Sequence, residues 1–160
     1  MPVRFPFGYG LSYSTFTYSA IAATATGVDF VVTNDSDVAG STVAQLYVRA
    51  PQGGVLHPDR ELKGFIKVEL AAHESKSVHI DFDRYTFRHF DVAANAWKTE
   101  SGEWTLLVGD NAEHLPLAIP HTVAGDCTTA DCAADPARGH YLTGRSKNVT
   151  DAEMAVLFGH

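Results

Sequence analysis

Apolar side chains recur at every second position through most of the chain, and this period restricts the fold more than any other feature. The clearest runs occupy residues 28–32, 44–48, 66–70, 78–82 and 104–108. Successive side chains of a strand point to opposite faces of a sheet, so each run offers one face to a core and the other mainly to water. Between Phe16 and Asp110 no stretch has the period of an amphipathic helix. We therefore predict an all-β structure for this region.

Weaker strand candidates and turn-forming segments complete the pattern. The weaker candidates are residues 16–21, 87–92 and 97–99. Turn chemistry separates the runs at residues 34–37, 51–54 and 57–59, and Ser101-Gly102 precedes the run that starts at Trp104. About seven short strands with this spacing are typical of an immunoglobulin-like antiparallel β-sandwich. We place that sandwich at residues 16–120.

The two ends of the chain have a different character. Residues 1–15 are dense in Gly, Pro and aromatic side chains without any period, which indicates a junction segment pressed onto another surface. Residues 121–148 are predicted to form an irregular linker. Residues 149–160 are predicted to form a short helix, because Thr150 and Glu153 fit a capping box and Met154, Leu157 and Phe158 share one face. So short a helix needs a neighbour for its apolar face.

Composition and charge exclude several classes of protein. The 160 residues are 45% apolar and 19% charged, which is ordinary for one globular domain with appendages. A net charge of −7 argues against nucleic acid or an anionic membrane as the partner. No apolar run is long enough to span a bilayer, and the first residues lack the apolar stretch of a signal peptide. Cytoplasmic and secreted locations both stay open.

Acidic pairs are weak candidates for catalysis. Glycosidases place two carboxyl groups roughly 5 to 10 Å apart, and Asp81 and Asp83 could share one face of a strand near the lower end of that range. Acidic residues on the outward face of a half-buried strand are, however, usually solvated. Glu100 and Glu103, which flank the expected turn, receive the same interpretation. No catalytic residue is predicted.

Cysteines and isolated aromatic residues are the remaining site candidates. Cys127 and Cys132 are a candidate disulfide. Structural zinc sites show two tight ligand pairs, so no metal and no other cofactor is expected. Trp104 belongs to an inward-facing set and is predicted to lie in the core. Trp97 stands beside a hairpin turn and is a candidate for stacking on a sugar ring.

Several motifs, in order, resemble the fibronectin type III-like domain of glycoside hydrolase family 3, whose members include β-glucosidases and β-xylosidases. The resemblance covers about residues 3 to 117. Its motifs are Phe5-Pro6-Phe7-Gly8-Tyr9-Gly10-Leu11-Ser12-Tyr13, Val32-Thr33-Asn34, Val43-Ala44-Gln45-Leu46-Tyr47-Val48, Glu61-Leu62-Lys63-Gly64-Phe65 and Gly102-Glu103-Trp104. The family pattern has Gly where Ser36 stands and Pro-Gly where Ala72-His73 stands, and both differences concern turns. Val149-Thr150-Asp151-Ala152-Glu153 is similar to a segment of circularly permuted members.

The resemblance implies an accessory role. In that family the nucleophilic aspartate and the acid/base glutamate lie on other domains, and neither motif has a matching position here. The implied partners are the catalytic domains of one parent chain, docked through Phe5, Phe7, Tyr9, Leu11 and Tyr13. The alternatives are a carbohydrate-binding module that uses Trp97 and a freestanding adhesive module.

Overall fold

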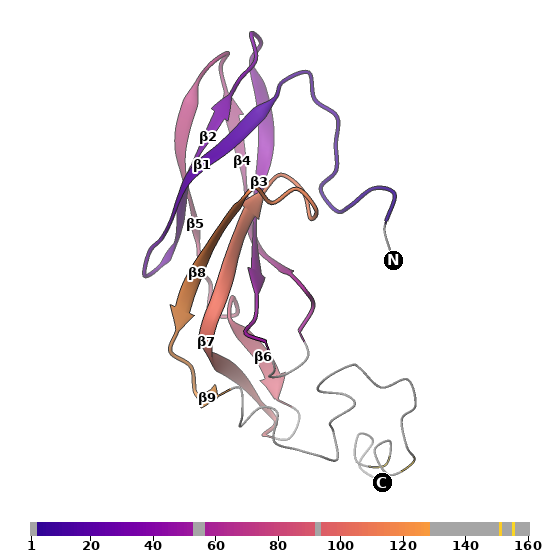
Figure 1. Cartoon of the computed structure of the whole chain (residues 1–160), viewed down its shortest axis with the longest axis vertical. Coiled ribbons are helices and arrows are strands. Elements are labelled where there is room, and N and C mark those ends of the chain that lie inside the picture. Colours follow the sequence, from indigo (N-terminus) through magenta and orange to yellow (C-terminus); the bar gives the residue numbers. More distant parts are fainter. Residues whose placement is uncertain (1–2, 53–56, 92–93, 129–150, 152–154, 156–160) are drawn as a thin grey trace.

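The protein folds as two packed β-sheets, as a computed structural model shows (Figure 1). The structure describes residues 3–52, 57–91, 94–128, 151 and 155. The described strands are β1 (Phe16–Ala23), β2 (Gly27–Asn34), β3 (Gly40–Arg49), β4 (Glu61–Leu70), β5 (Ser75–Asp81), β6 (Arg88–Asp91), β7 (Ala96–Gly109), β8 (Leu117–Val123) and β9 (Cys127–Thr128). One sheet has the order β1-β2-β5, and the other has the order β4-β3-β7-β6, with β8 and β9 also paired to β7. The predicted antiparallel β-sandwich is confirmed; the short pairing of β7 with β9 is parallel.

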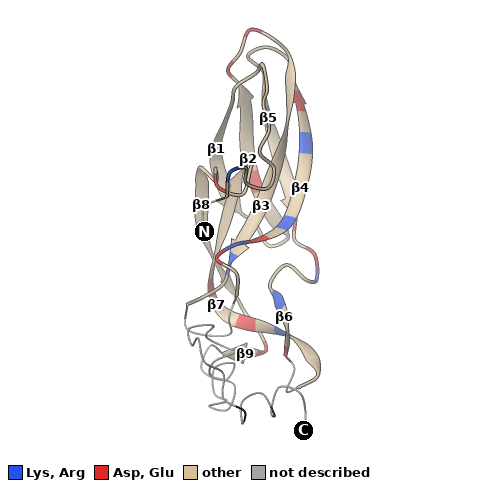
Figure 2. Cartoon of the chain, turned by 90° about the vertical axis from the view of Figure 1, so that its right-hand side faces the viewer, with Lys and Arg blue, Asp and Glu red and all other residues tan. Residues whose placement is uncertain are grey.

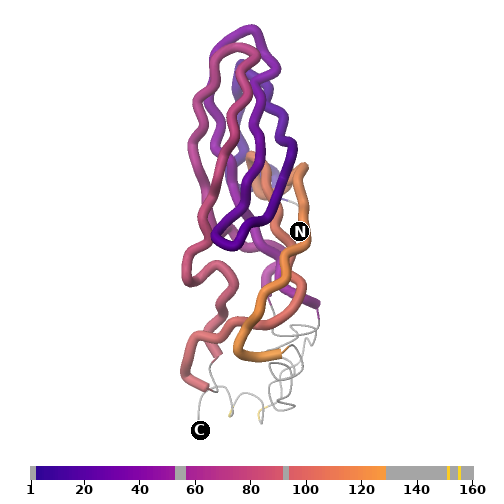
Figure 3. The backbone as a smooth tube through the Cα atoms, turned by 90° about the vertical axis from the view of Figure 1, so that its left-hand side faces the viewer, coloured from indigo at the N-terminus to yellow at the C-terminus, as the bar shows by residue number. Residues whose placement is uncertain are grey.

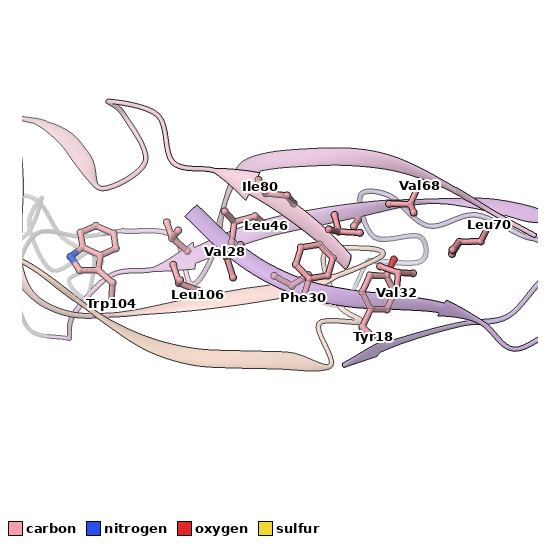
Figure 4. Packing of buried hydrophobic residues seen from close by; sticks show 14 of the residues in the cluster. Tyr18, Val28, Phe30, Val32, Leu46, Val68, Leu70, Ile80, Trp104 and Leu106 are labelled. Carbon is pink, nitrogen blue, oxygen red and sulfur yellow. The ribbon is translucent and has the colours of Figure 1, made fainter. Parts of the chain in front are cut away.

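The core lies between the two sheets and uses the alternating runs predicted from the sequence. Val28, Phe30 and Val32 of β2 face Leu46 of β3 and its neighbours, and all four are fully buried. Figure 4 shows these side chains in a row between the layers, with Trp104 at one end and Leu70 at the other. Trp104 is 1% exposed, which confirms its predicted place in the core. Buried side chains at every second position of strands far apart in the sequence thus form one core.

β3 departs from the expected alternation over residues 44–48, because side chains on both of its faces are buried there. Ala44, Leu46 and Val48 point into the core, yet Gln45 and Tyr47 on the other face are only 3% and 4% exposed. The expectation that this second face meets water is wrong. The Tyr47 hydroxyl donates to Gln45 Oε1 (2.7 Å), and Gln45 Nε2 donates to the Asp110 carbonyl (2.7 Å). The polar atoms are therefore paired, and burying them carries no unmet hydrogen bond.

β7 continues without a break through Ser101-Gly102, where a turn was expected, so that prediction is wrong. Its first part pairs with β6 and β9, and its second part pairs with β3 and β8. Gly102 lies between the two parts with φ of 151°, and a Cβ there would come within 2.9 Å of Pro51 Cγ. The glycine lets the strand change partners without ending. Figure 3 shows the result, an elongated body with β6 and the start of β7 at its lower end.

The end of the sandwich also differs from the expected boundary. β8 continues through Val123, and β9 follows at Cys127, so β-structure extends into the segment predicted to be a linker from residue 121. The side chains of β8 alternate between half-buried and exposed, and proline is unusual inside a strand, so residues 117–123 carry little strand signal. Most of the linker and of the predicted helix at 149–160 lies outside the described residues.

The two turn positions that depart from the family pattern are accommodated differently. Ser36 takes part in hydrogen bonds: its amide donates to Asn34 Oδ1 (3.1 Å), and its hydroxyl accepts from the Thr15 amide (2.7 Å). His73 instead adopts a left-handed conformation with φ of 58°. A residue with a Cβ is disfavoured there, whereas glycine is not. Its exposed ring contacts Asp37 Oδ1 (2.8 Å), which offsets only part of this strain.

We expect His73→Gly to be more stable than His73→Ala by about 1 kcal/mol, because both variants lose the contact with Asp37 and only alanine keeps the strained backbone. Urea unfolding of the two variants measures the difference. Ala72→Gly is the matched control at a position without positive φ, and there glycine should destabilise. Equal stability of the two His73 variants would contradict the argument.

Candidate docking surface

The junction segment exposes nearly all of its large apolar side chains. Residues 3–13 contribute Val3, Phe5, Phe7, Tyr9, Leu11 and Tyr13, each at least half exposed. Leu11 is 92% exposed and Tyr13 is fully exposed. Monomeric proteins rarely leave a continuous apolar strip in water unless it serves an interaction. Figure 1 shows this segment running beside the sandwich without joining either sheet.

The backbone of the junction segment is nevertheless attached to the sandwich at several points. The Tyr9 amide donates to the Pro6 carbonyl (3.0 Å) in a turn that places Gly8 at φ of 86°. The Ala112 amide donates to the Phe7 carbonyl (2.9 Å). A Cβ on Gly8 would collide with the Gln45 side chain, so the segment lies directly on the outer face of β3. These contacts explain the burial of that face.

A second anchor holds the C-terminal end of the same segment. Ser14 is buried, and its hydroxyl donates to the Val38 carbonyl (3.3 Å). The Asp35 amide donates to the Thr15 carbonyl (2.9 Å), next to the contact between Thr15 and Ser36 described above. The exposed side chains between the two anchors therefore project from a backbone that is held at both ends.

The exposed apolar surface continues onto the outer face of β3 and β4. Phe65 of β4 is directly opposite Gln45 in the antiparallel register, so the two side chains share a face. Phe65 is 71% exposed, and Val43 and Leu62 are also exposed. Gly8 lies on Gln45 of the same face. We call this combined area the docking surface: the six side chains named above with Val43, Leu62 and Phe65.

Sequence reasoning found the junction part of this surface and missed the strand part. The alternation of this run predicts that Ile66, Val68 and Leu70 face the core. Phe65 then points outward, and nothing in the local sequence indicates that it belongs to an apolar surface. Figure 2 shows charged residues along β4, whereas the described junction segment contains Arg4 as its single charged residue. The docking surface is thus mainly apolar and has charges at its edge.

A second group of exposed rings lies near the start of β7. Trp97 is half exposed and contacts Tyr85 and Phe90 with ring centroids at 5.3 and 5.7 Å. The ring planes meet at 60° and 78°, so they do not form the coplanar pair that a flat sugar-stacking platform requires. Arg84 lies over the Tyr85 ring at 4.6 Å. Sugar stacking by Trp97 stays a prediction.

Glu100 is the clearest correction to the sequence analysis, which expected a solvated side chain. It is fully buried, and its Oε2 lies 3.9 Å from His57 Nε2. The other ring nitrogen of His57 lies 3.1 Å from Glu61 Oε1, and the His57 ring contacts those of His89 and Trp104 edge-on, each at 5.6 Å. The bend at Gly102 brings the Trp104 indole N–H onto the Glu100 carbonyl (3.0 Å). This buried cluster had no signal in the local sequence.

The buried cluster shifts the pKa of two of its members. The hydrogen bond from His57 and the neighbouring Lys63 ammonium, at 3.0 Å, lower the pKa of Glu61 to about 2. Burial lowers the pKa of His89, and the nearby His57 adds to this effect. Glu61 is therefore a carboxylate and His89 is neutral at physiological pH.

The remaining candidates have structural contacts or lie partly outside the described residues. Asp83 Oδ1 accepts from the Tyr85 amide (2.8 Å) and the Thr86 hydroxyl (2.9 Å), while exposed Asp81 contacts His79 (3.3 Å). The Cys127 thiol lies 3.5 Å from the Thr99 carbonyl. Cys132 is outside the described residues, so the disulfide stays a prediction.

The described residues contain neither a candidate metal cluster nor a candidate membrane span. No group of three or more His, Cys, Asp or Glu side chains in that part of the chain is arranged to hold a metal ion. No helix there is long and apolar enough to cross a membrane.

Comparison with known proteins assigns this fold to a class. Residues 42–112 match the family model of the fibronectin type III-like domain. This part of the chain belongs to that domain family, as the sandwich topology and the sequence motifs indicated.

The relatives with the same segment are larger enzymes. An exo-α-(1→6)-L-arabinopyranosidase of Bifidobacterium breve is 40% identical over 129 residues, which are 78% of this chain and 17% of that protein. A probable β-glucosidase K of Emericella nidulans is 41% identical over 117 residues, which are 72% of this chain and 14% of that one. The crystal structure of a glycoside hydrolase family 3 β-glucosidase of Bifidobacterium adolescentis superposes with a TM-score of 0.73 at 37% identity, covering 78% of this chain and 19% of that one. The chain thus spans about one sixth of the curated relatives it matches, and in them this domain is part of a larger chain.

We expect the stability of the domain to fall on acidification in two steps. His89 has a lowered pKa in the folded state, so the unfolded chain takes up a proton first and stability falls as the pH drops below about 6.5. Glu61 contributes stability above its unfolded pKa of about 4.5, and this contribution is lost as the pH falls toward 2. Thermal unfolding between pH 7 and 2.5 measures both steps.

Two variants separate the contributions to this acid profile. His89→Gln should remove the first step and leave the second. His79→Gln should steepen the first step, because Asp29 raises the pKa of His79 and its protonation favours the folded state. An unchanged profile in His89→Gln would contradict the assignment.

Proposed function

We propose that this chain is a non-catalytic accessory domain of a glycoside hydrolase family 3 exo-β-glycosidase, and that it braces and orients the catalytic domains of its parent. The observation that carries the proposal is the docking surface: exposed apolar side chains on a segment whose backbone is anchored. A flexible tail would lose conformational entropy on docking, whereas an anchored strip has already lost most of it.

The relatives support the choice of partner. Each contains this domain within a chain about six times as long, and their names describe hydrolysis of glycosides. The partner that best fits the docking surface is therefore the catalytic portion of the same parent chain, with an apolar face that covers Phe5, Phe7, Tyr9, Leu11 and Tyr13. Phe65, Val43 and Leu62 would extend that contact onto the sheet.

A comparison of one variant in two settings tests the docking role. Leu11→Ser with Tyr13→Ser should leave the unfolding midpoint of the isolated chain unchanged, because both side chains are exposed there. In the full-length parent the same double substitution should lower the thermal midpoint and kcat/KM, since each buried apolar side chain contributes roughly 1.5–3 kcal/mol.

Trp97→Ala is the matched control for that comparison, because its ring is exposed but lies away from the docking surface. It should change the isolated chain and the parent by the same amount. If Leu11→Ser with Tyr13→Ser has no effect on the parent, the docking surface does not face the catalytic portion.

The isolated chain should hydrolyse no aryl β-glucoside or aryl α-L-arabinopyranoside. Release of nitrophenol from the two chromogenic substrates is the measurement, with the full-length parent as the positive control. Turnover that co-purifies with the chain through several columns would contradict the accessory role.

A further inference from the structure

Four buried polar atoms in the cluster around His57 lack a hydrogen-bond partner within the described residues. They are His57 Nε2, His89 Nδ1 and both carboxylate oxygens of Glu100. The side chain of Glu100 is 0% exposed and that of His57 is 8% exposed, so these groups are shielded from bulk water. Buried polar groups are almost always paired, either with protein groups or with ordered water. Four orphaned atoms at one point of the molecule therefore require an explanation.

The distance between His57 and Glu100 indicates what lies between them. His57 Nε2 is 3.9 Å from Glu100 Oε2, which is too long for a direct hydrogen bond. One water molecule that bonds to two atoms at about 2.8 Å each holds those atoms roughly 4 to 5 Å apart. The observed separation is close to the lower end of that range. A shared water therefore fits the gap that a direct contact does not.

The hydrogen-bonding roles of the two side chains favour the same occupant. His57 Nδ1 lies 3.1 Å from Glu61 Oε1, and a neutral imidazole that donates its one N–H to Glu61 leaves Nε2 as an acceptor. The carboxylate oxygens of Glu100 are acceptors as well. Two acceptors that face each other need a donor between them, and a water molecule can donate one O–H to each.

The remaining orphaned atoms are within the same cluster. The His57 and His89 rings lie at right angles with their centroids 5.6 Å apart, and His89 Nδ1 and Glu100 Oε1 are both buried. A buried water typically makes about three hydrogen bonds, so two waters are enough for all four atoms. In the part of the chain that the structure describes, no group of His, Cys, Asp and Glu side chains is arranged around a metal ion. Water is therefore the occupant that the geometry favours.

We propose that the cluster encloses ordered water, with one molecule hydrogen-bonded to both His57 Nε2 and Glu100 Oε2. This water joins the segment before β4 to β7, beside His89 of β6. The site is next to Trp104, which ends the row of core side chains in Figure 4 and whose indole N–H donates to the Glu100 carbonyl (3.0 Å). Glu100 is thus buried at the end of an apolar core without leaving its carboxylate unpaired. The inference is independent of the docking role.

A crystal structure of the full 160-residue chain, at a resolution that shows ordered waters, tests the site directly. We expect a water peak within about 2.6–3.2 Å of both His57 Nε2 and Glu100 Oε2. A direct hydrogen bond between the two side chains, with no density between them, would overturn the proposal. So would a peak at about 2.0–2.2 Å from both atoms with anomalous scattering at the zinc edge, because these distances identify a metal ion.

Solution NMR keeps the proposal falsifiable if the chain does not crystallise. The carbon-bound protons of the His57 ring should show cross-peaks to water, with the sign of a molecule that tumbles with the protein. Glu100→Gln should keep these cross-peaks, because its amide oxygen still accepts, whereas Glu100→Met should lose most of their intensity. Glu103→Gln is the matched control, since it changes an exposed carboxylate on the same strand, and it should leave the cross-peaks unchanged.

The wild-type chain decides the matter on its own if Glu100→Met fails to fold. Bound-water cross-peaks at His57 in the wild-type chain support the site, and their absence overturns it. Cross-peaks of equal intensity in the wild-type chain and a folded Glu100→Met variant also overturn it, because the water would then not depend on Glu100.

Discussion

The burial of residues 44–48 of β3 on both faces is the constraint on which the rest of the structure depends. One face completes the core with Ala44, Leu46 and Val48, and on the other face the junction segment lies on Gln45. Because Gly8 lies against Gln45 and the Phe7 carbonyl accepts from the Ala112 amide, the junction segment is packed on the sandwich. The large apolar side chains of this segment are each at least half exposed to solvent. The docking surface is a consequence of how β3 is buried.

The period-two pattern was sufficient to predict the sandwich, because alternation records directly which side chains meet the opposite sheet. It predicted the core positions on β2 and the burial of Trp104. It failed where cover comes from a distant segment: Gln45 belongs to the set that points away from the core, yet Gly8 lies against its side chain. Local patterns carry no information about such cover. β8 was missed for a related reason, since an edge strand with half-buried side chains has little apolar contrast.

Glu100 shows the same limit at the level of a site. A carboxylate beside Ser101-Gly102 is typical of a solvated turn, and the glycine itself supported that interpretation. In the structure the glycine serves as a bend within one long strand, and the bend turns Glu100 inward toward His57 and Trp104. Glu100 would thus be solvated if the strand ended at Gly102, and it is buried because the strand continues and pairs with other strands. That choice is made by the pairing of β7 with β3, β6 and β8, which only the tertiary structure reveals.

The two apolar surfaces of the domain are held by different kinds of contact. The junction segment is fixed by backbone hydrogen bonds to the loop after β7 and to the turn after β2, none of which depends on a titrating group. The exposed rings near the start of β7 instead pack on one another, with Trp97 in contact with Tyr85 and Phe90. A brace between domains needs the first kind of surface, because its geometry must not vary with solution conditions.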